Sequence, residues 1–171
     1  MSERFRSLFQ NPDKMAKEIG ISEGKVVADI GAGKGFLTIP ASAIVGKGGL
    51  VYSVEPDPNR SKLISERVAA EGLENVRVLT TGAEKLGEIP SGSVDAAFSV
   101  FSIHHFKDKA VSLAEIRRIL KSGGTFYAWD RVPSTIVRHG TRPAELEQLS
   151  GAFAKFELLN AQRTVKARFT K

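Results

Sequence analysis

The chain has 171 residues, 42% of them hydrophobic, and it contains no long polar or low-complexity tract. We therefore expect one globular domain that spans residues 1–171. Because cysteine is absent, disulfides, thiolate metal sites and a cysteine nucleophile are excluded, and no metal centre is predicted. No apolar run approaches the ~20 residues that cross a bilayer, and no secretory signal follows the first residues. The sequence thus predicts a cytoplasmic protein without a membrane partner.

The net charge of +6 is concentrated in the last quarter of the chain. Residues 131–171 carry eight Lys and Arg against three Asp and Glu, whereas the first 130 residues are nearly balanced. One interpretation is a surface that attracts an acidic substrate, nucleic acid or an anionic membrane. The other is a solvated face that aids solubility, and net charge alone does not decide between them.

The first twenty residues form an amphipathic segment that we predict to be helical. Its second part, residues 12–19, is expected to pack on the edge of the domain and to end at Gly20. Residues 1–10 have two interpretations, either more of this edge helix or a flap over a ligand site.

Strands and helices then alternate along the chain. Short apolar runs predict strands over residues 25–30, 50–54, 75–79, 94–100 and 125–129. Helices are predicted over residues 36–45, from Pro58 to Gly72 and from about residue 109 to Leu120, the last ended by Ser122-Gly123-Gly124. Residues 143–150 are predicted to be helical, and strands over 153–159 and 164–170 form a closing hairpin.

This alternation predicts an α/β fold with helices on both faces of a sheet. The expected architecture is a doubly wound, Rossmann-like three-layer sandwich. Its seven-stranded sheet is mostly parallel and carries an antiparallel C-terminal hairpin.

A glycine-rich turn follows the first predicted strand. Gly31, Gly33 and Gly35 stand at alternate positions between a buried strand and a helix. Glycines in such a turn let the main chain approach a ligand closely, and the following helix offers free N–H groups. In open α/β sheets ligands bind outside the carboxyl ends of the strands, so this turn should meet Glu55 and the Ala83-Glu84 pair in one crevice.

The spacing of these glycines bears on which ligand binds. The dinucleotide fingerprint is G-x-G-x-x-G, but here Phe36 stands where the third glycine belongs. Glu55 is suited to accept hydrogen bonds from two ribose hydroxyls, which does not discriminate between adenosine cofactors. Asp29 does discriminate, because a carboxylate at the end of a buried strand needs a positive partner and would repel a pyrophosphate.

Four blocks in order resemble the class I S-adenosylmethionine-dependent methyltransferases, of the kind called methyltransferase type 11. The blocks are residues 26–35, residues 51–57, residues 93–98 with 103–106, and residues 115–124. The resemblance implies S-adenosylmethionine as cofactor and S-adenosylhomocysteine as product. The implied contacts are Asp29, Gly31, Gly33 and Gly35 for the methionine moiety, Glu55 for the ribose, Pro56 and Asp57 beside the adenosine, Ala83 and Glu84 at the adenine edge, and Ser99 and Phe101 around the sulfonium and methyl.

One position departs from the resembling family. The family usually places an acidic residue just before the equivalent of Ala83, where it accepts from the adenine amino group, but this chain has Gly82. The N–H of Ala83 or the carboxylate of Glu84 is the expected substitute.

Methyl transfer from a sulfonium is a direct displacement, so the protein mainly supplies alignment. A base is needed only where the acceptor must lose a proton. His104 and His105 follow the strand over 94–100, and each is either a catalytic base or a residue that shapes the pocket. Asp130, at the end of the strand over 125–129, is a second candidate base.

The sequence indicates least about the identity of the methyl acceptor. The lack of cysteine excludes C5-cytosine methylation, and Ser99-Val100-Phe101-Ser102 stands where amino-group methylation of bases requires an N-P-P-Y type motif. The open acceptor side is expected to be covered by residues 1–10, by a second subunit of a homo-oligomer, or by a macromolecule. We predict a small-molecule acceptor, including an anionic one, ahead of RNA or protein. A non-catalytic adenosyl-binding module and an NAD-dependent oxidoreductase remain alternatives.

Overall fold

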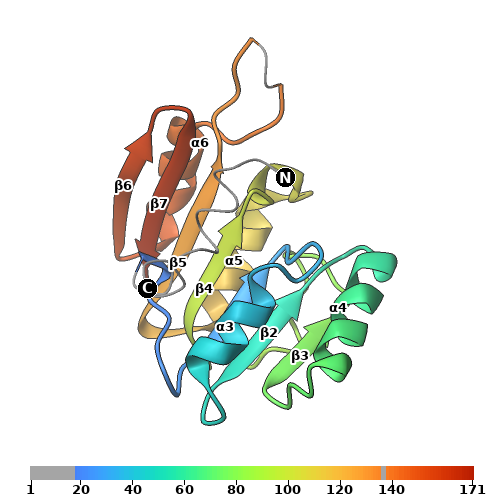
Figure 1. Ribbon diagram of the computed structural model, residues 1–171. Helices are drawn as coiled ribbons and strands as arrows, with labels where there is room; N and C mark the ends of the chain where they lie inside the picture. Colours follow the sequence, from blue (N-terminus) through green and yellow to red (C-terminus); the bar gives the residue numbers. More distant parts are fainter. Residues whose placement is uncertain (1–17, 136–137) are drawn as a thin grey trace.

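The computed structural model of the protein describes residues 18–135 and 138–171. Its centre is a seven-stranded sheet with the strand order β3-β2-β1-β4-β5-β7-β6 (Figure 1). Strands β1 to β5 run parallel, and β7 pairs antiparallel with both β5 and β6. The strands are β1 (Val26–Ile30), β2 (Leu50–Val54), β3 (Val76–Leu79), β4 (Val94–Val100), β5 (Leu120–Arg131), β6 (Lys155–Ala161) and β7 (Thr164–Thr170).

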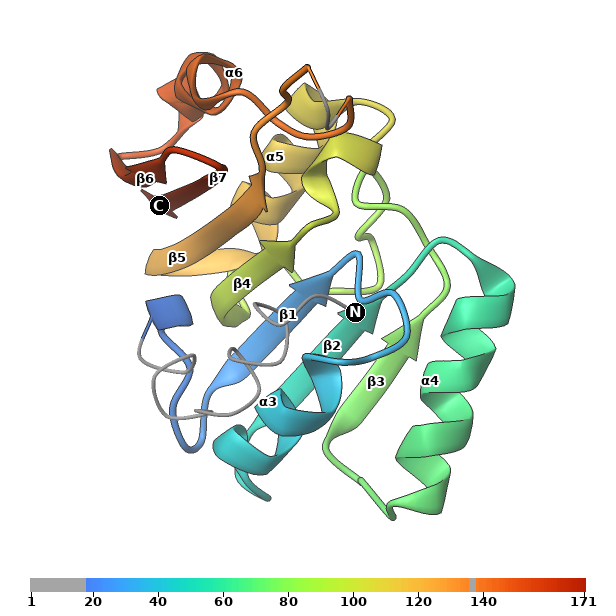
Figure 2. The same ribbon diagram turned by 45° about the horizontal axis from the view of Figure 1, so that its top comes forward.

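Helices cover both faces of the sheet, with α3 and α5 on opposite sides (Figure 2). Each face carries its own apolar core: α3 contributes Ala41 and Val45 to one, and α5 contributes Leu113 and Ile116 to the other. The described helices are α3 (Thr38–Val45), α4 (Pro58–Ala70), α5 (Lys109–Ile119) and α6 (Pro143–Gln148), with short 3-10 helices η1 (Ile103–His105) and η2 (Leu149–Ala152). This arrangement confirms the predicted α/β class and the antiparallel hairpin.

Several predicted boundaries are confirmed because the local signals are strong. Asp57 caps α4 by accepting from the N–H of Asn59 at 2.9 Å, with Pro58 in the first turn. Asp108 caps α5 through the N–H of Val111 at 3.0 Å. Gly20 ends the helical stretch at 18–19 with a φ of 89°. The predicted flap over residues 1–10 lies outside the described residues.

The start of β5 corrects the sequence prediction. Ser122-Gly123-Gly124 does not end α5. The helix stops at Ile119 and β5 begins at Leu120, opposite Val94 of β4. The register between the two strands then shifts, so the glycines form an irregularity inside a twelve-residue strand. The glycines indicate a turn by their local signal alone, but pairing of Leu120 and Thr125 with β4 includes them in the strand.

The other boundaries shift by a few residues. Helix α3 begins at Thr38 rather than at residue 36, and β6 begins at Lys155 rather than at residue 153. Within the described ranges, no helix is long and apolar enough to cross a membrane.

Candidate active site

A cleft of about 820 Å³ opens at the carboxyl ends of the parallel strands β1, β2, β3 and β4. The predicted residues that line it come from four separate turns, which the strand order β3-β2-β1-β4 brings together. These are Asp29, Gly31, Gly33, Glu55, Pro56, Ala83, Glu84, Phe101 and His105.

The three glycines of the first turn have different neighbours. A Cβ on Gly31 would lie 2.4 Å from Ser102 Oγ, and one on Gly35 would lie 3.2 Å from Ile64. Both positions therefore need a glycine because a side chain would crowd its neighbours. Only a Cβ on Gly33 would meet open space, at a φ of 62°. Gly35 does not line the cleft. The close approach to a ligand predicted for all three glycines therefore applies best to Gly33.

Two carboxylates are buried at the floor of the cleft. Asp29 is 2% exposed and accepts from Thr38 Oγ1 at 2.8 Å. Burial, and to a smaller extent the charge of Glu55, raises the pKa of Asp29 to about 7 against the lowering effect of the hydrogen bond from Thr38. Glu55 is 3% exposed and accepts from the N–H of Gly33 at 2.7 Å and of Asp57 at 3.1 Å.

This pair of carboxylates favours a cationic ligand. Two buried acids without a cation between them are costly, and a positively charged group beside Asp29 would remove much of that cost. The aminoacyl sulfonium of S-adenosylmethionine carries such charges, and Glu55 lies one strand away at the end of β2 with oxygens suited to a ribose. The residues present therefore fit this cofactor.

The position of the Glu84 carboxylate accounts for the glycine at position 82, where the family has an acidic residue. Glu84 Oε1 accepts from the N–H of Lys107 at 2.7 Å and of Asp108 at 3.2 Å. Although partial burial raises its pKa, these and other hydrogen bonds hold it below the usual range. A Cβ on Gly82 would lie 2.5 Å from Glu84 Oε2. Glu84 thus occupies the space where an acidic side chain at position 82 would begin.

Ser99 and Asp57 were expected to border the cofactor, but neither lines the cleft. Ser99 is fully buried, and its Oγ lies 2.6 Å from Ser102 Oγ. Ser102 lines the cleft in its place and donates to Ile30 O at 3.0 Å. The Asp57 carboxylate is used as the helix cap. Both cofactor roles remain predictions. Ser99 would act on the cofactor only through its hydrogen bond to Ser102.

Phe101 has an unusual backbone conformation at the end of β4. Its φ of 55° is the one positive value among the described non-glycine residues. The chain turns sharply here, with the Phe101 N–H donating to Trp129 O at 2.7 Å, and η1 follows at once. Such strain concentrates at functional sites. Here it aims η1, and with it the two histidines, across the end of β5.

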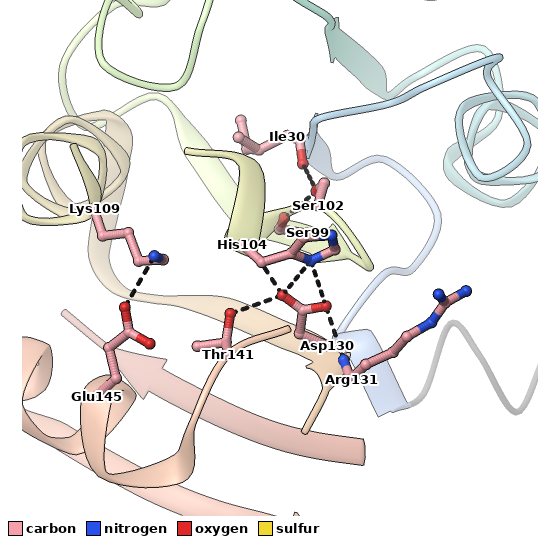
Figure 3. Close-up of polar contacts among 9 residues, drawn as sticks. All are labelled: Ile30, Ser99, Ser102, His104, Lys109, Asp130, Arg131, Thr141 and Glu145. Atoms are coloured by element: carbon pink, nitrogen blue, oxygen red, sulfur yellow. Dashed lines mark hydrogen bonds and ion pairs between the residues drawn. The ribbon is translucent and has the colours of Figure 1, made fainter. Parts of the chain in front are cut away.

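His104 and Asp130 form one hydrogen-bonded pair, where the sequence offered them as separate candidates (Figure 3). His104 Nδ1 lies 2.9 Å and 3.0 Å from the two carboxylate oxygens of Asp130. Asp130 has no exposed surface, and 11% of the His104 side chain is exposed. Neither residue lines the cleft itself, although the next residue along the chain, His105, does.

His105 is the histidine that lines the cleft. Its ring centroid is 4.0 Å from that of His104. Partial burial lowers the pKa of His105, and the neighbouring His104 lowers it further. Its ring is therefore predominantly neutral near pH 7.

Sequence reasoning missed several residues of the cleft. The basic members come from separate elements, so only their position in the fold reveals them, whereas Ser102 belongs to the recognised segment around the histidines. The missed lining residues include Lys34, Phe36, Arg60, Thr80, Ser102 and Lys107.

A glycine turn at the end of β1, an acidic residue at the end of β2 and a sheet closed by an antiparallel β7 define the class I methyltransferase fold. Residues 28–128 match the family model described as a methyltransferase domain. The chain belongs to this methyltransferase domain family, whose members use S-adenosylmethionine as cofactor.

Relatives and solved structures agree with this family. A ubiquinone/menaquinone biosynthesis C-methyltransferase of Marinomonas sp. is 32% identical over 61% of this chain and 42% of its own length. A demethylmenaquinone methyltransferase of Geobacillus stearothermophilus is 30% identical over 63% of this chain and 46% of its own. The chain thus spans about half the length of such relatives. A SAM-dependent methyltransferase structure from Aquifex aeolicus superposes with a TM-score of 0.76 at 25% identity, covering 94% of this chain and 89% of that one.

Proposed function

We propose that this protein transfers the methyl group of S-adenosylmethionine to a small-molecule acceptor that carries an ionisable hydroxyl, such as a phenol or a quinol. The His104–Asp130 pair beside the cofactor cleft is the observation on which this proposal rests. When bound, S-adenosylmethionine supplies an electrophilic methyl group on a cationic sulfur.

The chain's own residues hold and orient the cofactor in this proposal. Asp29 binds the cationic amino group, Gly33 lets the backbone approach, and Glu55 accepts from the ribose. Pro56 and Ala83 form the apolar walls around the adenosine. The hydroxyl of Ser102, just after β4, lies near the sulfonium end of the cofactor. Alignment of this kind is the main contribution a protein makes to a direct displacement.

His104 acts as the base that takes the acceptor's proton. An ionised carboxylate only accepts hydrogen bonds, so the neutral His104 ring must carry its proton on Nδ1, facing Asp130. Its Nε2 is then left with a free lone pair, and the carboxylate stabilises the cation that forms on protonation. An acceptor that already has a free lone pair, such as a neutral amine, needs no such base.

An acceptor with an ionisable hydroxyl on a ring can be methylated either on that oxygen or on a neighbouring ring carbon. Loss of the hydroxyl proton makes the oxygen nucleophilic and also enriches the neighbouring ring carbon. The two relatives named for ubiquinone/menaquinone and demethylmenaquinone methylation support a quinol-type acceptor of this kind.

Cofactor specificity is tested first, by thermal unfolding with S-adenosylmethionine, S-adenosylhomocysteine and NAD at matched concentrations. Saturation at 100 times the dissociation constant should stabilise the fold by about 2.7 kcal/mol. We expect a rise in Tm with the two adenosyl ligands and none with NAD. Stabilisation by NAD alone contradicts the proposal.

Acceptor chemistry is tested with labelled methyl transfer to a 1,4-naphthoquinol that lacks a ring methyl group, to a simple phenol and to a primary amine. Transfer to the hydroxyl compounds should fall about 100-fold in His104→Gln, with unchanged cofactor affinity. His105→Gln is the matched control and should lose much less. Equal loss in both variants, or transfer to the amine alone, contradicts a base at His104. Tight cofactor binding without transfer to any acceptor favours a non-catalytic module.

A second candidate acceptor is RNA, favoured by the exposed cations Arg138, Arg142 and Arg163 near the acceptor side. Binding of a short RNA with an affinity that falls steeply as salt increases would support it. Failure to bind RNA at low salt excludes this candidate.

A further inference from the structure

Thr141 is a buried residue that belongs neither to the cleft nor to the pair described above. It lies between β5 and α6 and has no exposed surface. Its Oγ1 donates to Asp130 Oδ2 at 2.8 Å, and its N–H donates to Arg131 O at 2.8 Å (Figure 3). Side chain and backbone therefore both attach this segment to the end of β5.

The Asp130 carboxylate has its hydrogen-bonding positions filled from three segments. Oδ1 accepts from the N–H of Arg131 at 2.8 Å and faces His104 Nδ1. Oδ2 accepts from the backbone N–H of His104 at 3.0 Å and from Thr141, and also faces Nδ1. Because both oxygens are held by donors other than the imidazole, the plane of the carboxylate is fixed before the ring meets it.

The hydroxyl of Thr141 is the one side-chain donor, besides the imidazole, in this set. If it is removed, Oδ2 keeps only a backbone donor and the shared Nδ1, while the carboxylate remains buried. A buried oxygen that loses a partner turns toward another donor, and the nearest mobile donor is the imidazole. His104 would then lose its fixed orientation.

We infer that Thr141 is a positioning residue that fixes the Asp130 carboxylate, and through it holds His104 with Nδ1 protonated and Nε2 available to the acceptor. This inference rests on the proposed role of His104 as base. The segment before α6, which carries Arg138, His139 and Arg142, is thus linked to the Asp130 carboxylate by one hydroxyl, and through that carboxylate to the base.

The charged groups around the base are few and come from separate elements. Asp130 of β5 and His105 of η1 face the His104 ring directly. His139 from the segment before α6 and Arg60 of α4 act on His105 at longer range.

The first test is a structural measurement that needs no acceptor. The chain has only three histidines, so long-range 1H–15N spectra resolve each ring and report which nitrogen carries the proton. We expect one Nδ1–H tautomer for His104 in the wild type and in Thr141→Ser. In Thr141→Val the ring should keep this tautomer, because the Asp130 carboxylate still needs a donor, but its Nδ1–H signal should shift and broaden as the carboxylate turns. Thr170→Val in β7 makes the same chemical change far from Asp130 and should leave the His104 signals unmoved.

The second test is kinetic and uses the 1,4-naphthoquinol acceptor. Thr141→Val should lower kcat about tenfold, as expected for loss of a hydrogen bond to a charged group, with cofactor affinity unchanged. Thr141→Ser should restore most of the rate, and the loss should lessen as pH rises and the acceptor ionises without help.

If Thr141→Val does not fold, Thr141→Cys offers a side chain of similar size with a weak donor, and the same spectra are read on it. If the His104 ring signals of Thr141→Val or Thr141→Cys match those of the wild type, the inference is overturned. An equal loss of kcat in Thr170→Val overturns it too. If no acceptor is methylated, the proposed function fails, whereas the His104 ring signals still decide the role of Thr141.

Discussion

At the scale of single residues, Asp29 makes the stability of the ligand-free protein depend on pH. Its folded pKa of about 7 exceeds the ordinary value of 3.8, so the fold favours the protonated acid. The associated stability is present below pH ~4 and is lost as pH rises through 7. The loss is on the order of 4 kcal/mol at about 1.4 kcal/mol per pKa unit.

We therefore expect Asp29→Asn to gain stability relative to the wild type between pH 5 and pH 8, as measured by urea unfolding at both values. The lowered pKa of His105 gives the wild type the opposite slope in this window, so the difference between the two proteins is the quantity to compare. Asp95→Asn serves as the control, because hydrogen bonds from Lys121 and Val26 lower the pKa of Asp95 despite burial and its slope lies at lower pH. Equal differences at pH 5 and pH 8 for Asp29→Asn would contradict the buried-acid explanation.

Gly31 and Gly33 are expected to respond differently to the same substitution. Both have positive φ, so an alanine costs about 1 kcal/mol of backbone strain at each. At Gly31 the new methyl group also displaces Ser102 from its bond to Ile30, whereas at Gly33 it projects into the cleft. Gly31→Ala should lower stability by roughly 1–2 kcal/mol more than Gly33→Ala. Gly33→Ala should chiefly weaken cofactor binding in calorimetry. The reverse order of stabilities would show that these contacts are not the cause.

At the scale of elements, β5 joins the parallel and antiparallel parts of the sheet. It pairs with β4 on one side and with β7 on the other, and its last residues carry Asp130. The irregularity at its start depends on Gly124, where a Cβ would lie 2.9 Å from Lys121 O and 3.1 Å from Asp95 O. Because both are backbone atoms, neither can move aside cheaply.

Gly124→Ala should therefore destabilise the protein by about 2 kcal/mol. Gly87→Ala is the matched control, since a Cβ at that position would have no atom within 4 Å and neither glycine has a positive φ. Its effect should stay within about 0.5 kcal/mol. Chemical unfolding of both variants checks this, and equal effects would mean that the glycine is not needed for space.

At the scale of the whole molecule, the fold brings part of the basic end of the chain to the edge of the sheet where the cleft lies. The N–H of Val132 donates to Arg163 O at 3.2 Å, so the β6–β7 turn meets the segment after β5. The Arg131 guanidinium lies 5.4 Å from the ring centroid of Phe101, which lines the cleft. Arg131 therefore lies beside a residue of the cleft, whereas Lys155 and Lys171 lie at the opposite end of the hairpin, near the start of β5.

Replacing Arg138, Arg142 and Arg163 together by Gln should raise the KM of a carboxylate-bearing naphthoquinol several-fold at low salt, with less effect at about 0.5 M salt, where screening is strong. Cofactor affinity should not change. The control replaces Lys47, Lys62 and Arg77, which are exposed at the other end of the sheet order. Equal effects of the two triple variants would favour the interpretation that the charge only aids solubility.

Local signals in the sequence determined much of the fold. The apolar run of β4, the Asp57-Pro58 start of α4 and the alternation of Val165, Ala167 and Phe169 in β7 each identify an element without help from distant residues. The glycine turn with Asp29 and Glu55 likewise located the cleft, because the carboxyl ends of parallel strands meet at one edge of a sheet.

Tertiary structure decided what depends on neighbours far apart in the chain. It extended β5 back to Leu120 through the predicted Ser122-Gly123-Gly124 turn, because the strand pairs with β4 on both sides of the irregularity. It filled the space beside Gly31 with Ser102, and it joined His104 to Asp130 and Asp130 to Thr141. Those partners lie 26 and 11 residues apart in sequence. Periodicity and spacing report only local geometry, whereas such pairs exist only once the order of the strands is fixed.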